Sequence, residues 1–167
     1  MTKVLAAIGL VLFLAQPVAA QNRGPSTPEE RMQALQLTRA LERDPLSRGA
    51  RDARAWLVVW LTTVPDITVQ VCGEFMKPLL GDKRNYAAEI FTQSMFSSAA
   101  FVIEHPDEKD NPEAKYLAGV EGSLRAYESI RTAKPKVKWP ILDELIAKRD
   151  AGQLGQYVRE RLPACSN

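Results

Sequence analysis

The sequence predicts an all-α protein: a compact, bundle-like single domain of about five to seven helices with one disulfide. Apolar residues recur at intervals of three and four along most of the chain, and proline or glycine separates these periodic stretches. Only one short stretch alternates as a β-strand would. Of the 167 residues, 46% are hydrophobic, which is enough to form one core in a domain of this length.

The N-terminal residues predict export. They combine a positive charge at Lys3, an apolar run, and a small-residue cleavage site that ends at Ala20. The apolar run is shorter than the roughly 18 residues that a membrane span requires. We therefore expect a cleaved signal peptide at residues 1–20, a flexible tether at 21–26, and a single helical domain at 27–167, located in the periplasm or outside the cell.

The first predicted helix covers residues 27–43. Thr27 and Glu30 have the spacing of a capping box, in which each side chain binds the backbone N–H of the other residue. The periodicity places Glu42 on the polar side of this helix. Asp44, which precedes a proline, ends it.

Residues 51–63 predict the central helix of the bundle. Trp56 and Trp60 are four positions apart, and Val58 and Val59 occupy further faces. The helix has almost no polar side, so we expect other helices to surround it. The alternative interpretation is that the tryptophan pair lines a pocket for a sugar or an acyl chain.

Residues 66–80 fit two structures. Ile67, Val69 and Val71 alternate with polar residues as in a strand, but no second convincing strand is present to accept the backbone hydrogen bonds. We therefore favour a helix that is capped by Asp66.

The remaining helices follow clear boundaries. Residues 85–105 mix bulky side chains with small ones at 97–100, which allow another helix to approach closely. Proline begins the next two helices, which cover residues 111–133 and the stretch from Trp139 to Gly152. The last predicted helix covers residues 154–162.

Cys72 and Cys165 predict one structural disulfide. Exported proteins fold under oxidising conditions, and the pair has neither CxxC spacing nor a nearby histidine. The bond would stabilise the fold by about 4–5 kcal/mol in the chain-entropy description. The alternative is a reactive or metal-binding cysteine, but no neighbouring residue indicates a lowered pKa. We expect no metal site and no cofactor.

One local motif resembles a known repeat. Residues 124–128, Leu-Arg-Ala-Tyr-Glu, are followed by Ile130, Ala133 and Pro135, and together they are similar to the second helix of a tetratricopeptide repeat. The match covers one helix, and no period of about 34 residues recurs in the chain, so we do not assign the family. The resemblance implies a helical scaffold that binds protein segments.

Residues that could support catalysis are few. His105 is the only imidazole available to activate Ser123, which lacks the flanking pattern of a nucleophile elbow. Glu121 and Glu128 are seven positions apart on one helix face and either serve acid–base hydrolysis or are surface charges. The acidic residues at 107–113 lack the spacing of a calcium loop, and we interpret them as favouring the positive end of the next helix.

We expect a non-catalytic, soluble protein-interaction or structural domain of the cell envelope, which binds another envelope or secreted protein. The first alternative is a carrier of a small amphiphilic ligand, and the second is a carboxylate- or histidine-dependent hydrolase. The net charge of +2 gives no bias toward nucleic acid or an anionic membrane. Lys134, Lys136 and Lys138 form either a solvated turn or a landing site for an acidic partner. The candidate ligand or partner contacts are Trp56, Trp60, Phe91 and Phe101.

Overall fold

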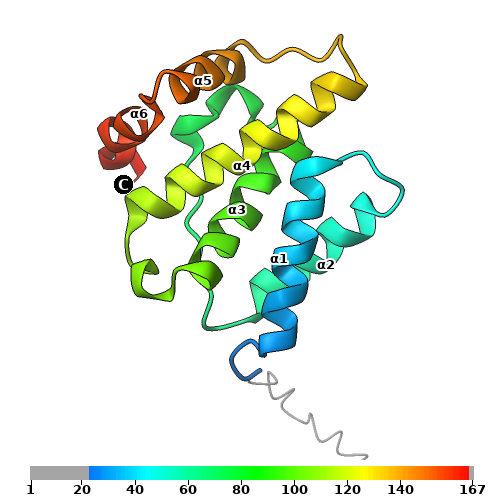
Figure 1. The fold of residues 1–167 in the computed structure, drawn as a ribbon, viewed down its shortest axis with the longest axis vertical. Helices are drawn as coiled ribbons and strands as arrows, with labels where there is room; N and C mark the ends of the chain where they lie inside the picture. Colours follow the sequence, from blue (N-terminus) through cyan, green and yellow to red (C-terminus); the bar gives the residue numbers. More distant parts are fainter. Residues whose placement is uncertain (1–22, 166–167) are drawn as a thin grey trace, which may run out of the picture.

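The computed structural model describes residues 23–165, and within this range it is helical without any β-strand, so the all-α prediction is confirmed (Figure 1). The predicted signal peptide at residues 1–20 lies outside the described residues. In the described part of the chain, six α-helices and four short 3-10 helices follow one another in this order: α1 (Pro28–Arg43), α2 (Ala50–Thr63), η1 (Gly73–Phe75), η2 (Lys77–Leu79), α3 (Ala87–Glu104), η3 (Pro106–Glu108), α4 (Pro112–Ala133), α5 (Pro140–Asp150), α6 (Leu154–Arg161) and η4 (Leu162–Cys165).

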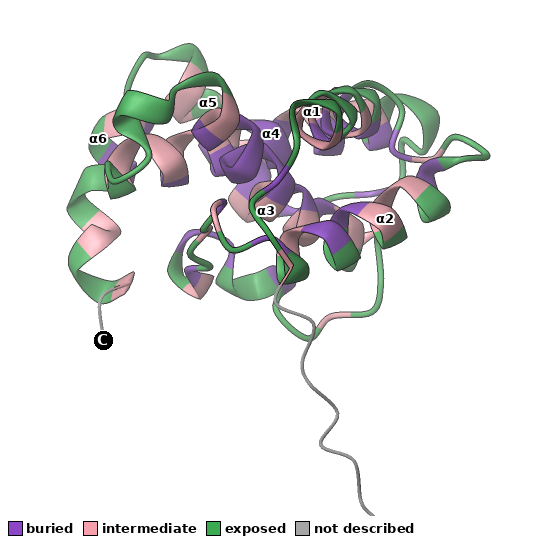
Figure 2. Ribbon diagram, turned by 90° about the horizontal axis from the view of Figure 1, so that it is seen from below, coloured by how far each residue is buried: buried purple, intermediate pink, exposed green. Residues whose placement is uncertain are grey.

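α3 and α4 form an antiparallel hairpin at the centre of the molecule (Figures 1 and 2). Their backbones approach closely because glycine faces serine across the interface. A Cβ atom on Gly119 would lie 2.8 Å from the carbonyl oxygen of Ser94, and one on Gly122 would overlap the side chain of Ser97. Residues 97–100 are all buried, as their small side chains predict.

Two clusters of buried side chains fill the two sides of this hairpin. One joins α3 and α4 to α5 and α6, with Tyr127 and Leu142 among its largest members. The other joins α3 to α1 and α2 around Trp60 and Phe96. α3 contributes to both clusters, and this explains why it is the most buried helix and takes the central position.

Helix starts follow the local signals in the sequence. The hydroxyl of Thr27 accepts a hydrogen bond from the backbone N–H of Glu30 at 3.2 Å, and the Glu30 carboxylate accepts one from the N–H of Thr27 at 3.0 Å. The side chain of Asn111 caps α4 in the same way. These contacts confirm the predicted capping box and the predicted start of α4.

The prediction of a helix at residues 66–80 is wrong. The chain is extended here and then makes the two turns η1 and η2. Ile67 is buried in the cluster with α1 and α2, whereas Phe75 is buried in the cluster with α5 and α6. The segment has to cross from one cluster to the other, and an extended chain covers more than twice the distance of a helix of equal length.

The prediction that α2 is the central helix is also wrong. Leu57 and Trp60 are buried against α1 and α3, but Val58 is 40% exposed and Val59 is 63% exposed. α2 lies at the periphery of the molecule (Figure 2), with Val58 and Val59 exposed to solvent. The apolar residues on all faces of α2 predicted neighbouring helices on all faces. In the described part of the chain, neighbouring helices cover only one side of α2.

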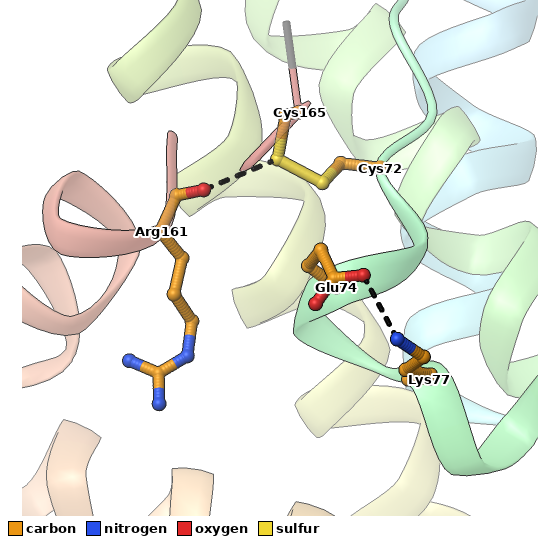
Figure 3. The surroundings of a disulfide bond; sticks show 5 residues. All are labelled: Cys72, Glu74, Lys77, Arg161 and Cys165. Atoms are coloured by element: carbon orange, nitrogen blue, oxygen red, sulfur yellow. Dashed lines mark hydrogen bonds and ion pairs between the residues drawn. A yellow bond between two sulfur atoms is a disulfide. The ribbon is translucent and has the colours of Figure 1, made fainter. Parts of the chain in front are cut away.

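The predicted disulfide between Cys72 and Cys165 is present. It joins the chain just before η1 to the end of η4, with a Cα–Cα distance of 5.3 Å (Figure 3). The Sγ atom of Cys165 lies 3.6 Å from the carbonyl oxygen of Arg161. The bond therefore attaches the C-terminal turn to the middle of the chain.

Candidate functional site

The residues considered for hydrolysis do not form a site. His105 is exposed at the end of α3, where its ring lies 4.7 Å from that of Phe101. Ser123 is fully buried in α4, and its hydroxyl donates a hydrogen bond to the carbonyl of Ile90 at 2.8 Å. The hydroxyl is therefore neither accessible to a substrate nor free to be activated by His105.

The two predicted carboxylates on α4 are engaged at the surface. Glu121 lies 3.7 Å from Arg125, and Glu128 binds Arg149 with both oxygens at 2.8 and 2.9 Å. Each carboxylate is thus paired with a different arginine. Within residues 23–165, no group of three or more His, Cys, Asp or Glu side chains is placed to hold a metal ion.

The most buried charge belongs to Glu42, which the sequence placed on a polar face. Its carboxylate accepts hydrogen bonds from Ser97 at 2.8 Å, from Arg125 at 3.0 Å and from Arg39 at 3.0 Å. Burial acts to raise the pKa of Glu42, but the bonds from Arg125 and Ser97 and the charges of both arginines outweigh it and lower the pKa. The carboxylate joins α1, α3 and α4, and its oxygens are occupied by these hydrogen bonds.

The candidate aromatic contacts are not gathered around one cavity. Trp56 and Trp60 stack with ring centroids 5.8 Å apart, and the Nε1 atom of Trp60 is buried without a hydrogen-bond partner among residues 23–165. Phe91 packs on the cluster with α5 and α6 instead. Phe101 lies at the end of α3 beside His105. Trp56 and Trp60 thus lie together, whereas Phe91 and Phe101 lie at other places in the fold.

An apolar groove does exist, between the exposed side of α2 and the first two turns of α3. It is shallow and has a volume of about 430 Å³. Small side chains at Ala55 and Ala88 leave the space, and Val58 and Val59 form one wall. The groove is lined by Arg54, Ala55, Val58, Val59, Ala88, Glu89 and Thr92.

The lining of the groove includes one charge of each sign, Arg54 and Glu89. Arg54 is held in place by a hydrogen bond to the carbonyl of Pro45, and Glu89 on α3 is close enough to interact with its charge. Sequence reasoning missed this groove because Val58 and Val59 were assigned to the core. No local signal in the sequence distinguishes these two valines from core residues, because their exposure depends on how many helices surround α2.

A larger hollow of about 570 Å³ lies between residues 65–70 and the start of α4. Its lining is mixed, with Lys109 and Lys115 set against Asp66 and Asp110. Asp66 is already bound by Ser26 and Arg31. The balanced charges select neither an anion nor a cation.

No protein-family model matches the chain, and neither the curated proteins nor the solved structures include a significant match. Within residues 23–165, no helix has both the length and the hydrophobicity needed to cross a membrane.

Proposed function

We propose that the protein is an exported, non-catalytic protein-binding domain, and that the groove between α2 and α3 binds the apolar face of a helix from another envelope or secreted protein. The observation that carries this proposal is the uncovered apolar side of α2. Val58 and Val59 lie on a helix whose opposite side is buried in the core. An apolar patch on the surface of a folded domain is typical of an interaction site.

The shape of the groove favours a helix over a small molecule. Pockets for small ligands enclose most of the ligand surface and place several polar groups around it. This groove is shallow, and aliphatic side chains line most of it. A shallow channel between two helices suits side chains that project from one face of a third helix, as in helix-in-groove recognition.

The disulfide supports the export of the domain. Cys72 and Cys165 are the only cysteines of the chain, and they are bonded to each other. Structural disulfides persist in oxidising compartments and are rare in the cytosol. The expected partner is therefore found in the same compartment, among envelope or secreted proteins.

Site-specific photo-crosslinking in the native cells tests the proposal. A benzophenone amino acid at position 59 should crosslink to one defined protein. The same amino acid at position 71 is the matched control, since Val71 is 51% exposed and lies outside the groove. Absence of a crosslink at position 59, or equal crosslinking at both positions, would contradict the proposal.

A pair of substitutions provides a second test. Val59→Asp places a charge on the groove wall and should weaken binding of the crosslinked protein at least about tenfold, as expected for a central apolar contact. Val71→Asp should change the affinity less than about twofold. Circular dichroism should show both variants folded, because each side chain is exposed.

A further inference from the structure

Unpaired positive charges collect at one end of the molecule. Residues 43–52 comprise the last residue of α1, the turn to α2 and the first three residues of α2, whereas residues 134–139 form the turn from α4 to α5. Together the two turns contain six basic and only two acidic residues. None of the six makes an ion pair among the described residues; they are Arg43, Arg48, Arg51, Lys134, Lys136 and Lys138.

The fold brings the two turns to the same end. The hydroxyl of Ser129, near the end of α4, donates hydrogen bonds to the carbonyls of Glu42 and Arg43 at the end of α1, at 3.1 and 3.0 Å. Both turns begin just beyond this contact, at the upper right of the molecule in Figure 1. We name the six cations the basic end.

The chain itself offsets only part of the charge of the basic end. Asp44 and Asp52 lie in the first turn, and six basic minus two acidic residues leave the two turns with a net charge of +4. The acidic residues at 107–110 lie before the first turn of α4, and the 22 residues of that helix separate them from Lys134. At 1.5 Å per residue this is about 33 Å, several times the screening distance at physiological salt. The positive potential of the basic end is therefore available to another molecule.

The basic end continues into the groove along a single face of α2. Arg51, Ala55 and Val58 follow at intervals of four and three, which places them on one stripe of the helix. Arg51 therefore lies one turn beyond Ala55 in the groove. A molecule that binds along this stripe meets apolar surface first and positive charge next.

We propose that the protein partner of the groove carries an acidic surface next to its apolar helix face, and that this surface docks on the basic end. The proposal rests on the proposed function, because it describes the same partner. Three of the cations are arginines, whose planar guanidinium groups can bind a carboxylate through two hydrogen bonds. The lysines at 134, 136 and 138 add positive charge, which speeds the encounter with an acidic protein.

An acidic protein fits the basic end better than an anionic bilayer does. Peripheral membrane proteins combine positive charge with exposed large apolar side chains that enter the bilayer. Among the described residues, no Trp or Phe is among the exposed large apolar side chains. Those that adjoin the basic end are Val58 and Val59, which line the groove, whereas Met32, Val71 and Leu80 lie elsewhere.

Charge reversal in the crosslinking experiment tests the proposal. Arg48→Glu with Lys136→Glu changes one cation in each turn, in the protein that carries the photo-crosslinker at position 59. Lys109→Glu with Lys115→Glu is the control, since it alters net charge equally at the other end of α4. The first pair should lower the crosslink yield at least about fivefold, and the control pair should change it less than about twofold.

The identity and affinity of the crosslinked protein complete the test. The surface around the crosslinked segment should be acidic, and the purified complex should weaken about tenfold or more between 50 and 300 mM NaCl. Equal yields for both charge variants, or a neutral or basic partner surface, would overturn this inference and leave the groove proposal intact. Loss of crosslinking at position 59 in the parent protein would overturn both.

A lipid assay distinguishes the membrane alternative. Vesicles of phosphatidylglycerol and phosphatidylethanolamine should not co-sediment with the purified protein at physiological salt. Co-sedimentation that Arg48→Glu with Lys136→Glu abolishes, and that the control pair retains, would assign the basic end to a bilayer surface and overturn the proposal.

Discussion

Glu42 connects three helices through a single carboxylate. It is 5% exposed and receives hydrogen bonds from α1, α3 and α4. A buried carboxylate without such partners would strongly destabilise the fold. The three helices therefore have to pack in the one arrangement that brings these partners to Glu42. This supports a role for Glu42 in positioning α1, and with it α2, against the central hairpin.

Removal of the Glu42 carboxylate tests this role. Glu42→Ala should lower the free energy of unfolding by about 2 kcal/mol, because it leaves Ser97 and part of Arg125 without an acceptor. Glu121→Ala removes a half-exposed carboxylate that also faces Arg125 and should cost less than about 0.5 kcal/mol. Urea denaturation measures both, and equal losses would contradict the role assigned to Glu42.

Replacement by alanine should change the stability of the protein in opposite directions at two helical glycines. Gly122→Ala should destabilise the protein by about 1–3 kcal/mol, because the new methyl group would overlap Ser97 on α3. Gly155→Ala in α6 should stabilise it by about 0.5–1 kcal/mol, since the nearest atom, on Leu117, would be 3.9 Å from the new Cβ. Thermal denaturation of both variants checks the sign of each change.

The segment that follows α2 is attached to the start of α1. The carboxylate of Asp66 accepts hydrogen bonds from the backbone and the hydroxyl of Ser26 and from Arg31, each at 2.7 Å. Partial burial acts to raise the pKa of Asp66, but these bonds outweigh it and lower the pKa from 3.8 to about 2. Asp66 thus connects the chain just after α2 to the chain at the start of α1.

Acid should weaken this attachment. Because the pKa of Asp66 is lower in the folded state, its stabilising effect is complete above about pH 4 and is lost as pH falls toward 2. Asp66→Asn should cost about 1–2 kcal/mol at pH 7 and flatten the fall in stability between pH 4 and 2. Asp107→Asn, at an exposed site, is the control. An unchanged pH profile in Asp66→Asn would contradict this account.

Local signals explain which elements could be predicted. The starts of α1 and α4 depend on a cap and a proline within three residues, and both were predicted correctly. The path of residues 66–80 depends on two separate clusters of buried side chains, which no local pattern encodes. The groove could not be predicted for the same reason, because the exposure of Val59 depends on how many helices surround α2.

The disulfide acts on the whole chain, since its two cysteines are 93 positions apart. Replacing both with serine should lower the free energy of unfolding by about 3–5 kcal/mol, mainly by enlarging the unfolded ensemble. Far-ultraviolet circular dichroism should still show helix for the variant. If the free energy of unfolding fell by less than 1 kcal/mol, this prediction would be wrong, and other contacts would hold the C-terminal turn in place.

The disulfide also divides the molecule. It closes a covalent ring from residue 72 to residue 165, which contains α3 to α6, whereas α1 and α2 lie outside the ring. The groove has one wall on each side of this division, with Val58 and Val59 outside and Ala88 and Thr92 inside. A bound helix would bridge the two parts, so it should slow amide hydrogen exchange throughout α1 and α2, which the covalent ring does not constrain.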